Sequence, residues 1–389
     1  MNFEYSPEQQ MLADSLRRLV SERWTQAQRR ARQGGLDPAA WQALADLGIT
    51  GLTIPAEYGG FGEPPDSLLP VHLELGRGLV DEPVIASSVI GAALLGACGA
   101  DNTGDAGDGA HQHASAAAHN WLPRIASGQA IVTLAYQEPG RRYATEPRDC
   151  RLSGRGAAQV LNGSKHLVWH AAAAQAWLVS AMEAASGQPV LLIVPADAAG
   201  VTVNETATLD RSRCARIDFK QTPVPDSAVL ARGDAARGAL ASALQWGVAA
   251  LCAHAAGAMT RLLEITAEYL KTRRQFSQPL AAFQALQHRI AEMAVAREIG
   301  VSMAYVAVAA LSEPDAHQRR RMIAAAKLEV ARAGRLIGQY AIQLHGGIGM
   351  TDELEVGDYF KRLTAFDLLL GDSAEQLTVL TTQEQEQEA

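Results

Sequence analysis

The sequence has few cysteines, and they are not clustered. Its four cysteines (Cys98, Cys150, Cys214 and Cys252) lie far apart and show none of the short spacings of metal-binding or redox-active sites. This scatter excludes a small secreted domain built on disulfides and is typical of reduced thiols in the cytoplasm. We therefore expect a cytoplasmic protein with structural cysteines and no metal site.

Long runs of one chemical character are also missing. The net charge is −8 and no long basic stretch interrupts the sequence, which argues against a nucleic-acid partner. The most apolar run, residues 84–100, is rich in small residues, contains glycines and is shorter than the roughly 20 residues of a membrane span. The first ten residues are acidic and polar, so we expect neither a secretory signal nor a membrane anchor.

The 389 residues exceed one ordinary hydrophobic core, so two or three packed units are expected. Apolar residues recur at helical spacing at both ends of the chain, whereas short β-rich runs bounded by Gly, Pro and Asn occupy the middle. The pattern predicts an α+β protein with an N-terminal helical domain (1–122), a middle β-barrel or sandwich (123–233) and a C-terminal four-helix bundle (234–389). Residues 101–119 lack an apolar period and are predicted to form an exposed flexible insertion.

Three local signals give sharper expectations. Ser6, Pro7 and Gln9 together predict a helix start with a capping box. Asn162-Gly163 is typical of a β-hairpin turn. A final helix is expected to run from about Val356 through Leu380.

A basic corner follows a long helical stretch whose apolar stripe ends at Leu270. Arg273 and Arg274 precede Gln275 and Phe276, and Gln278-Pro279 then ends any helix, because proline cannot continue one. Paired cations beside an aromatic ring, held on a short connection, suit a phosphate-bearing ligand with a flat ring. The alternative is a solvated basic helix end that complements the helix dipole.

Two motifs resemble the acyl-CoA dehydrogenase family. The first is Arg273 to Phe276 with Pro279-Leu280 and Phe283-Gln284, which is similar to the family's R-x-x-F…P-[IL]…FQ signature. The second is the stretch 343–350, QLHGGIGM, which is similar to its Q-x-x-G-G-x-G turn. The resemblance covers nearly the whole chain. Near the end, GGIGMTDE…VGDYFKRLT resembles the small subunit of pimeloyl-CoA dehydrogenase, a hetero-oligomeric member.

The resemblance implies an FAD-dependent enzyme that desaturates an acyl-CoA thioester and passes electrons to an electron-transfer flavoprotein. It also implies that some residues reach the FAD of a neighbouring subunit rather than the chain's own. We expect seven cofactor-binding residues: Arg273, Gln275, Phe276, Gln284, Gln343, Gly346 and Gly347. For Gln284, a solvated or interface role is the open alternative.

The match is poorer where the family holds the flavin ring and the catalytic base. The family's T-E-P-x-x-G-S-D appears here as residues 137–144, QEPGRRYA, and the threonine of its W-x-T is replaced by Trp169, which we interpret as a core aromatic. The two places where family members carry the glutamate base fall at Gly371 and Gly247. Asp372 and Asp367 are the nearby carboxylates, and either could equally be structural. The catalytic residue therefore stays unassigned.

Three hypotheses remain. The chain could be the base-less subunit of a hetero-oligomer that completes a shared FAD site with a homologous subunit. It could instead be a self-sufficient homo-oligomer that uses Asp372 or another base. Finally, it could be a helical interaction protein that has lost FAD.

Overall fold

The computed structural model describes residues 5–99, 110–154 and 158–388. The chain forms two compact units, each assembled from separate stretches of sequence. The helical unit comprises Met1–Gln33, Pro65–Val80 and Val248–Ala389, and the sheet unit comprises Gly34–Pro64 and Asp81–Gly247. The N-terminal segment that the sequence predicts as one domain thus supplies residues to both units, and the three-domain boundaries stay a prediction.

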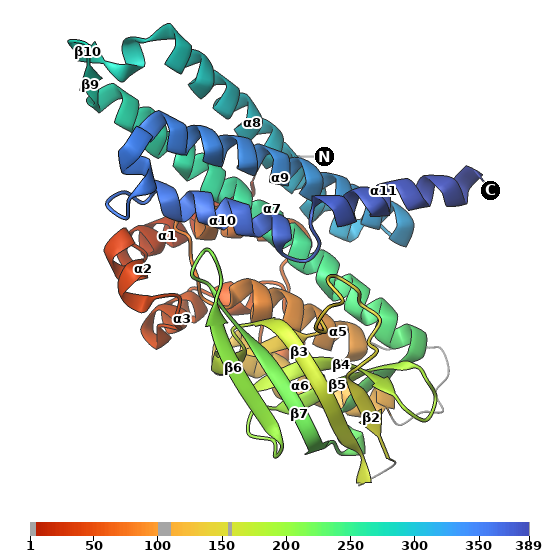
Figure 1. Ribbon diagram of the computed structural model, residues 1–389. Coiled ribbons are helices and arrows are strands. Elements are labelled where there is room, and N and C mark those ends of the chain that lie inside the picture. The colour runs from red at the N-terminus through yellow and green to blue at the C-terminus, as the bar shows by residue number, and fades with distance from the viewer. Residues whose placement is uncertain (1–4, 100–109, 155–157, 389) are drawn as a thin grey trace. The chain divides into compact units, whose positions relative to one another are not determined.

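The helical unit is built on α9, against which α8, α10 and α11 pack (Figure 1). Its helices are α1 (Pro7–Arg23), α2 (Gln26–Arg32), α4 (Leu68–Arg77), α8 (Gln284–Ala309), α9 (Ala316–His345), α10 (Val356–Leu368), α11 (Ser373–Glu388) and the second part of α7 (Gly233–Thr272). A two-stranded hairpin of β9 (Arg274–Gln275) and β10 (Gln278–Pro279) joins α7 to α8.

Helix α1 starts where the sequence predicts. The Ser6 hydroxyl accepts a hydrogen bond from the Gln9 backbone N–H at 3.2 Å, and the Gln9 side chain accepts one from the Ser6 N–H at 3.0 Å. The capping box is therefore confirmed, because its geometry depends only on residues within one turn.

The described residues of the sheet unit form one mixed sheet. Its strands are β1 (Val132–Ala135), β2 (Arg151–Ser153), β3 (Val160–Trp169), β4 (Ala176–Glu183), β5 (Pro189–Pro195), β6 (Val201–Ala207), β7 (Arg213–Pro223) and β8 (Val229–Arg232). They are ordered β6-β7-β3-β2-β4-β5-β8, with β1 parallel to β4. The unit also contains α3 (Pro38–Asp46), α5 (Ala92–Gly99), α6 (Ala110–Ala126) and the π-helical turn η4 (Val84–Gly91). Among the described strands β6 and β8 do not pair, so hydrogen bonding leaves the sheet open.

The predicted turn at Asn162-Gly163 is wrong. Both residues lie inside β3, which pairs with β7 and shifts register between Leu161 and Gly163. Gly163 has φ +134°, and a Cβ there would lie 2.5 Å from Cys150 Cα. The glycine therefore marks a bulge where another segment approaches the backbone, which local turn statistics do not foresee.

The exposed insertion is also wrong where the structure describes it. Residues 110–119 begin helix α6, and Ala114 and Ala118 are 1% and 0% exposed. Helix α6 packs on α5, where Gly99 comes close to the Ala118 methyl group. An alanine-rich sequence looks featureless on an apolar scale, yet it allows two helices to approach closely. The rest of the predicted insertion, 101–109, lies outside the described residues.

The single final helix is two helices. Helix α10 ends at Leu368 and α11 starts at Ser373. Leu370 and Gly371 between them have φ +56° and +105°, which no helix continues through.

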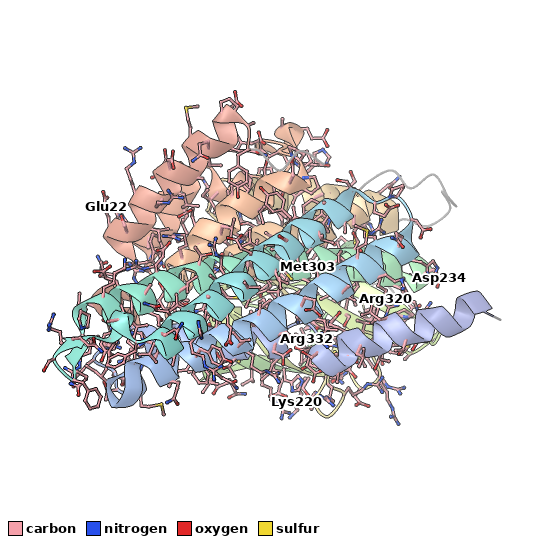
Figure 2. All side chains as sticks on the ribbon, turned by 90° about the horizontal axis from the view of Figure 1, so that it is seen from above. Glu22, Lys220, Asp234, Met303, Arg320 and Arg332 are labelled. Carbon is pink, nitrogen blue, oxygen red and sulfur yellow. The ribbon has the colours of Figure 1, made fainter. Side chains whose placement is uncertain are left out.

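Within the part of the chain that the structure describes, two helical stretches, α7 and Gln284–Ser312, are long and apolar enough to cross a membrane by length and composition alone. The apolar window of α7 is 72% buried, as in the core helix of a protein outside the membrane, whereas that of Gln284–Ser312 is 33% buried. Figure 2 looks onto α8, with Met303 labelled, beside α9 with Arg332 labelled. Helix α8 leaves Val295 and Ile299 61% and 47% exposed, so this face is apolar and uncovered within the described chain.

Candidate functional site

The basic corner is a tight hairpin that displays an aromatic ring. Gln275 pairs with Gln278 across a two-residue turn whose central residues, Phe276 and Ser277, have φ +51° and +67°. Positive φ at both positions is what a type I′ turn requires. The Phe276 side chain is 87% exposed. Among the described aromatic pairs it takes part in one, an edge-on contact with Phe283 whose ring centres lie 6.1 Å apart.

The two arginines of the corner differ in what they bind. The Arg274 guanidinium donates to the Ser277 carbonyl at 2.9 Å and so braces the hairpin. The exposed Arg273 guanidinium makes no hydrogen bond or ion pair within residues 5–99, 110–154 and 158–388. Its backbone is fixed nonetheless, since Arg273 N–H donates to Tyr269 O at 2.8 Å and Leu280 N–H donates to Arg273 O at 2.8 Å. Arg273 therefore has a fixed backbone and a guanidinium that is available to a ligand.

The glycine motif caps α9 with an open backbone. Gly346 has φ +66° and ψ −146°, a region that glycine alone enters readily, and its N–H donates to Gln343 O and Ile342 O. Gly346 and Gly347 are both exposed, and a Cβ added at either would meet nothing within 4 Å. Neighbouring side chains therefore leave room for another molecule to approach this turn closely.

The corner and the glycine turn lie side by side. The Tyr269 ring, one turn before Arg273, stacks on the His345 ring with centres 4.3 Å apart. Farther along, Arg289 of α8 donates to the Tyr340 hydroxyl of α9 at 2.5 Å. The structure thus brings together two motifs that lie far apart in sequence. All seven predicted cofactor residues are exposed, namely Arg273, Gln275, Phe276, Gln284, Gln343, Gly346 and Gly347.

The 137–143 loop of the sheet unit is closed on itself. Gln137 is 8% exposed, and its amide donates to Arg142 O at 3.1 Å. Glu138, 1% exposed, accepts from the N–H groups of Arg148, Asp149 and Cys150 at 2.9–3.0 Å.

The Lys165 ammonium completes this buried arrangement, 3.0 Å from Glu138 Oε1. Burial alone would raise the pKa of the Glu138 carboxyl, but Lys165 and the backbone N–H groups hold that pKa below its usual value. Glu138 is therefore a structural ion. Trp169, interpreted as a core aromatic, is half-buried at the end of β3.

The segment that would carry the family's base is a tight turn without a free carboxylate. Gly371 is buried at φ +105°, and an added Cβ would lie 2.5 Å from the Gln376 amide nitrogen. Its carbonyl accepts from the Lys327 ammonium and from the Gln376 amide. The alternative position, Gly247, is buried inside α7.

The two nearby carboxylates have structural partners. One Asp372 oxygen accepts from the Glu375 N–H at 2.9 Å and so caps α11. Asp367 accepts from the Ser373 hydroxyl at 2.6 Å and from Arg335 at 2.8 Å. Both carboxylates hold the turn between α10 and α11.

Lys327 is a residue that sequence reasoning missed. It is 1% exposed, and its ammonium also donates to Leu369 O, so it ties α9 to the α10–α11 turn from within. Burial lowers the pKa of Lys327 to about 8. A lysine on the apolar stripe of a predicted helix was the available signal, since such a lysine needs buried partners.

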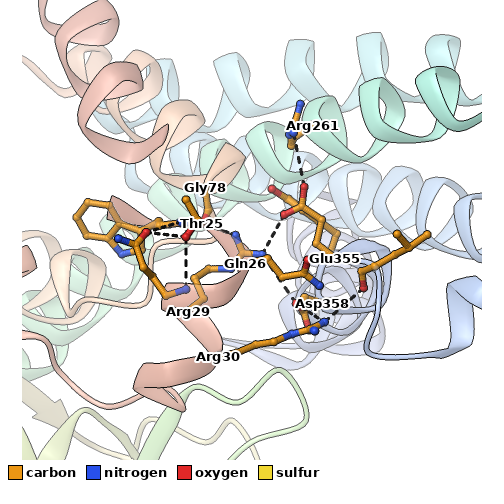
Figure 3. Close-up of polar contacts among 12 residues, drawn as sticks. Thr25, Gln26, Arg29, Arg30, Gly78, Arg261, Glu355 and Asp358 are labelled. Carbon is orange, nitrogen blue, oxygen red and sulfur yellow. Dashed lines mark hydrogen bonds and ion pairs between the residues drawn. The ribbon is translucent and has the colours of Figure 1, made fainter. Parts of the chain in front are cut away.

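An open cavity of about 800 Å³ lies in the helical unit, and Tyr269 and His345 are among the residues that line it. Ion pairs cross its wall: Arg29 of α2 lies 3.2 Å from Glu355, and Arg261 of α7 lies 3.5 Å from the same carboxylate (Figure 3). Arg29 is 8% exposed and also bonds to the Gly78 carbonyl. These contacts connect α2, α7 and the start of α10.

Comparison with known proteins defines the class. The family models for the N-terminal and C-terminal domains of acyl-CoA dehydrogenases match residues 6–103 and 237–383. The acyl-CoA dehydrogenase IpdE2 of Mycobacterium tuberculosis is 30% identical, over 97% of each chain. The chain therefore belongs to the acyl-CoA dehydrogenase family, and its predicted fold class is confirmed. It is an FAD-dependent oxidoreductase of the class that acts on acyl-CoA.

Two other relatives are similar along their whole length. The probable acyl-CoA dehydrogenase YngJ of Bacillus subtilis is 27% identical, over 98% of this chain and 99% of its own. A solved structure of a variant of the Tcur3481-Tcur3483 steroid ACAD has a TM-score of 0.83 at 27% identity, over 98% of both chains.

Proposed function

We propose that this chain is the base-less subunit of a hetero-oligomeric acyl-CoA dehydrogenase and that it completes an FAD site in a homologous partner subunit. The observation that carries the proposal is the exposed guanidinium of Arg273, unpaired within the described residues, beside the open glycine turn. We call the seven predicted cofactor residues the clamp, namely Arg273, Gln275, Phe276, Gln284, Gln343, Gly346 and Gly347. None of the clamp residues lines the cavity inside the described helical unit.

The clamp fits the adenosine-diphosphate part of FAD. A guanidinium neutralises and binds phosphate, the glycine turn leaves room for it to approach, and an exposed ring on a rigid turn can pack on a flat base. FAD, when bound, supplies the electron acceptor for the acyl chain. On this proposal, the chain's own contribution is to hold the cofactor's phosphate end, while the partner provides the flavin-ring pocket and the carboxylate.

The sheet unit and the α10–α11 turn support the same division. The Gln137 amide and the Glu138 carboxylate are bonded within the chain, so they offer little to a flavin ring. Gly371 has no side chain to take a proton, and the Asp372 carboxylate caps a helix. The self-sufficient enzyme that uses Asp372 is therefore the weaker candidate.

A partner subunit also agrees with the uncovered apolar face of α8 around Val295 and Ile299. The solved steroid ACAD carries two joined names, Tcur3481 and Tcur3483, which suits an assembly of two different chains. The four cysteines are free and buried, as in a reducing compartment such as the cytoplasm. We extend the proposal to an acyl-CoA thioester as substrate and an electron-transfer flavoprotein as electron acceptor.

Flavin stoichiometry tests the proposal directly. We expect this chain to hold little FAD when purified alone and about one FAD per two chains when co-purified with a homologous subunit. Asp372→Asn should leave the activity of the complex unchanged. A homo-oligomer that holds one FAD per chain and reduces it with an acyl-CoA would contradict the proposal. A complex that carries no flavin at all would favour a helical interaction protein.

A further inference from the structure

The two parts of the clamp meet through one pair of stacked rings. Tyr269 and His345 stack with centres 4.3 Å apart and planes 26° from parallel. Tyr269 is half-buried, and His345 is 4% exposed. The pair joins the end of α7 to the end of α9, where the two motifs begin.

Each ring is one short step from a clamp residue. The Tyr269 carbonyl accepts the Arg273 N–H at 2.8 Å, so the start of the hairpin is fixed to the residue that carries the ring. His345 directly precedes Gly346, and its carbonyl lies 3.4 Å from the Tyr269 hydroxyl. A change in how the rings stack would therefore move the Arg273 backbone and the glycine turn relative to each other.

The His345 ring is itself held in one orientation. Its Nδ1 lies 2.8 Å from the Ala341 carbonyl, and because a carbonyl only accepts, Nδ1 carries the proton. Burial lowers the pKa of His345, so the ring stays neutral at neutral pH. Its Nε2 has no partner among the described protein atoms. The ring is thus anchored to its own helix on one side and stacked on Tyr269.

The cavity that the pair lines makes the ring stack sensitive to truncation of either ring. Both rings line the space of about 800 Å³, together with Trp24 between α1 and α2 and Tyr359 of α10. On that side no close-packed layer of described residues stands behind the stack. If one ring is truncated, its neighbour can turn into the cavity, and the two motifs lose their common support.

We propose that Tyr269 and His345 form a positioning pair that holds the Arg273 hairpin and the Gly346–Gly347 turn at the spacing needed to bind one diphosphate together. The inference rests on the proposed clamp and adds residues that contact no cofactor themselves. It assigns FAD affinity to a contact that adjoins the clamp residues without being one of them.

The test measures FAD affinity and thermal stability of the purified FAD-loaded assembly. His345→Leu and Tyr269→Leu should each weaken FAD binding about two- to tenfold, the size expected from losing one aromatic pair. Tyr269→Phe keeps the ring and loses only the 3.4 Å contact of the hydroxyl with the His345 carbonyl, so it should weaken FAD binding less than Tyr269→Leu. The matched control is Tyr305→Leu, which breaks another stacked pair of the helical unit, Tyr5–Tyr305, with centres 6.4 Å apart. It should lower the melting temperature without changing FAD affinity.

A double-mutant cycle separates positioning from plain stability. Because the pair acts through Arg273, His345→Leu should cost less affinity in an Arg273→Ala background than in the unmodified chain. Additive effects would overturn the inference, as would Leu variants that melt earlier yet bind FAD normally. If Arg273→Ala alone leaves FAD affinity unchanged, the clamp itself is wrong and the positioning pair fails with it.

Discussion

The corner of the helical unit and the 137–143 loop of the sheet unit differ in how their polar groups are bonded. At the corner, the Arg273 guanidinium and the backbone of Gly347 are exposed without a described side-chain partner. In the loop, the Gln137 amide and both Glu138 oxygens are bonded to their own chain. Buried polar groups need such partners, whereas groups meant for another molecule must stay available. On the proposed function, this difference separates a surface kept for a partner from a loop that serves only the chain's own structure.

Destabilising the 137–143 loop tests the structural side of this comparison. It is the change with the largest expected effect. Lys165→Met removes the ammonium that lies 3.0 Å from Glu138 and 3.0 Å from Tyr136 O. Losing one partner of a buried ion pair destabilises a protein by about 3–5 kcal/mol. We expect a clear drop in the free energy of unfolding, measured by thermal melting, with FAD affinity of the folded complex nearly unchanged.

The pH dependence adds a signed check on Lys165→Met. The folded-state pKa of Glu138 is lowered from 4.5, so its stabilisation is present above about pH 4.5 and is lost as pH falls through the folded pKa. Without Lys165 that loss should begin at higher pH. Arg237→Met, which breaks an exposed pair with Glu146, is the matched control and should change little. Strong loss of FAD with Lys165→Met would show that the loop still serves the flavin.

Removing the exposed guanidinium of Arg273 tests the binding side of the comparison. Arg273→Ala should weaken FAD retention by about 1.5–3 kcal/mol, because a diphosphate loses a charge-assisted hydrogen bond. Arg274→Ala should matter less for FAD, since that guanidinium is bonded to Ser277 O. Flavin fluorescence on dilution of the complex measures both. Reversed effects would mean that Arg274 leaves the hairpin to bind the phosphate.

Placing the family's carboxylate at position 371 should not restore activity. Of the substitutions considered, it has the smallest expected effect. Gly371→Glu places a side chain at φ +105° with its Cβ 2.5 Å from the Gln376 amide. Strained backbone of this kind costs about 1–3 kcal/mol, so the melting temperature should fall without any gain of activity. Gly371→Ala separates strain from charge and should show most of the same loss. Activity gained by the lone chain would revive the self-sufficient enzyme.

The predictable parts of the molecule were those set by local chemistry or by long motifs. The capping box at Ser6 needed only one helical turn, and the two family motifs marked both the fold and the exposed corner. Asn162-Gly163 failed because pairing with β7 decides its conformation. Residues 110–119 failed because the close approach of Ala118 to Gly99 depends on another helix. The break before α11 depends on Lys327, which is 44 positions away from Gly371.

On the proposed function, the Phe276–Ser277 turn has a consequence for how fast this chain and a partner subunit associate. Neither residue is glycine, yet both adopt positive φ, so the chain accepts the conformational strain during its own folding. The phenyl ring is then presented on a fixed hairpin before any partner arrives. Encounter need not wait for a loop to order, and orientation alone limits association, which typically gives rates of about 10⁵–10⁷ M⁻¹s⁻¹. Association at this corner would then be the docking of surfaces that are already ordered.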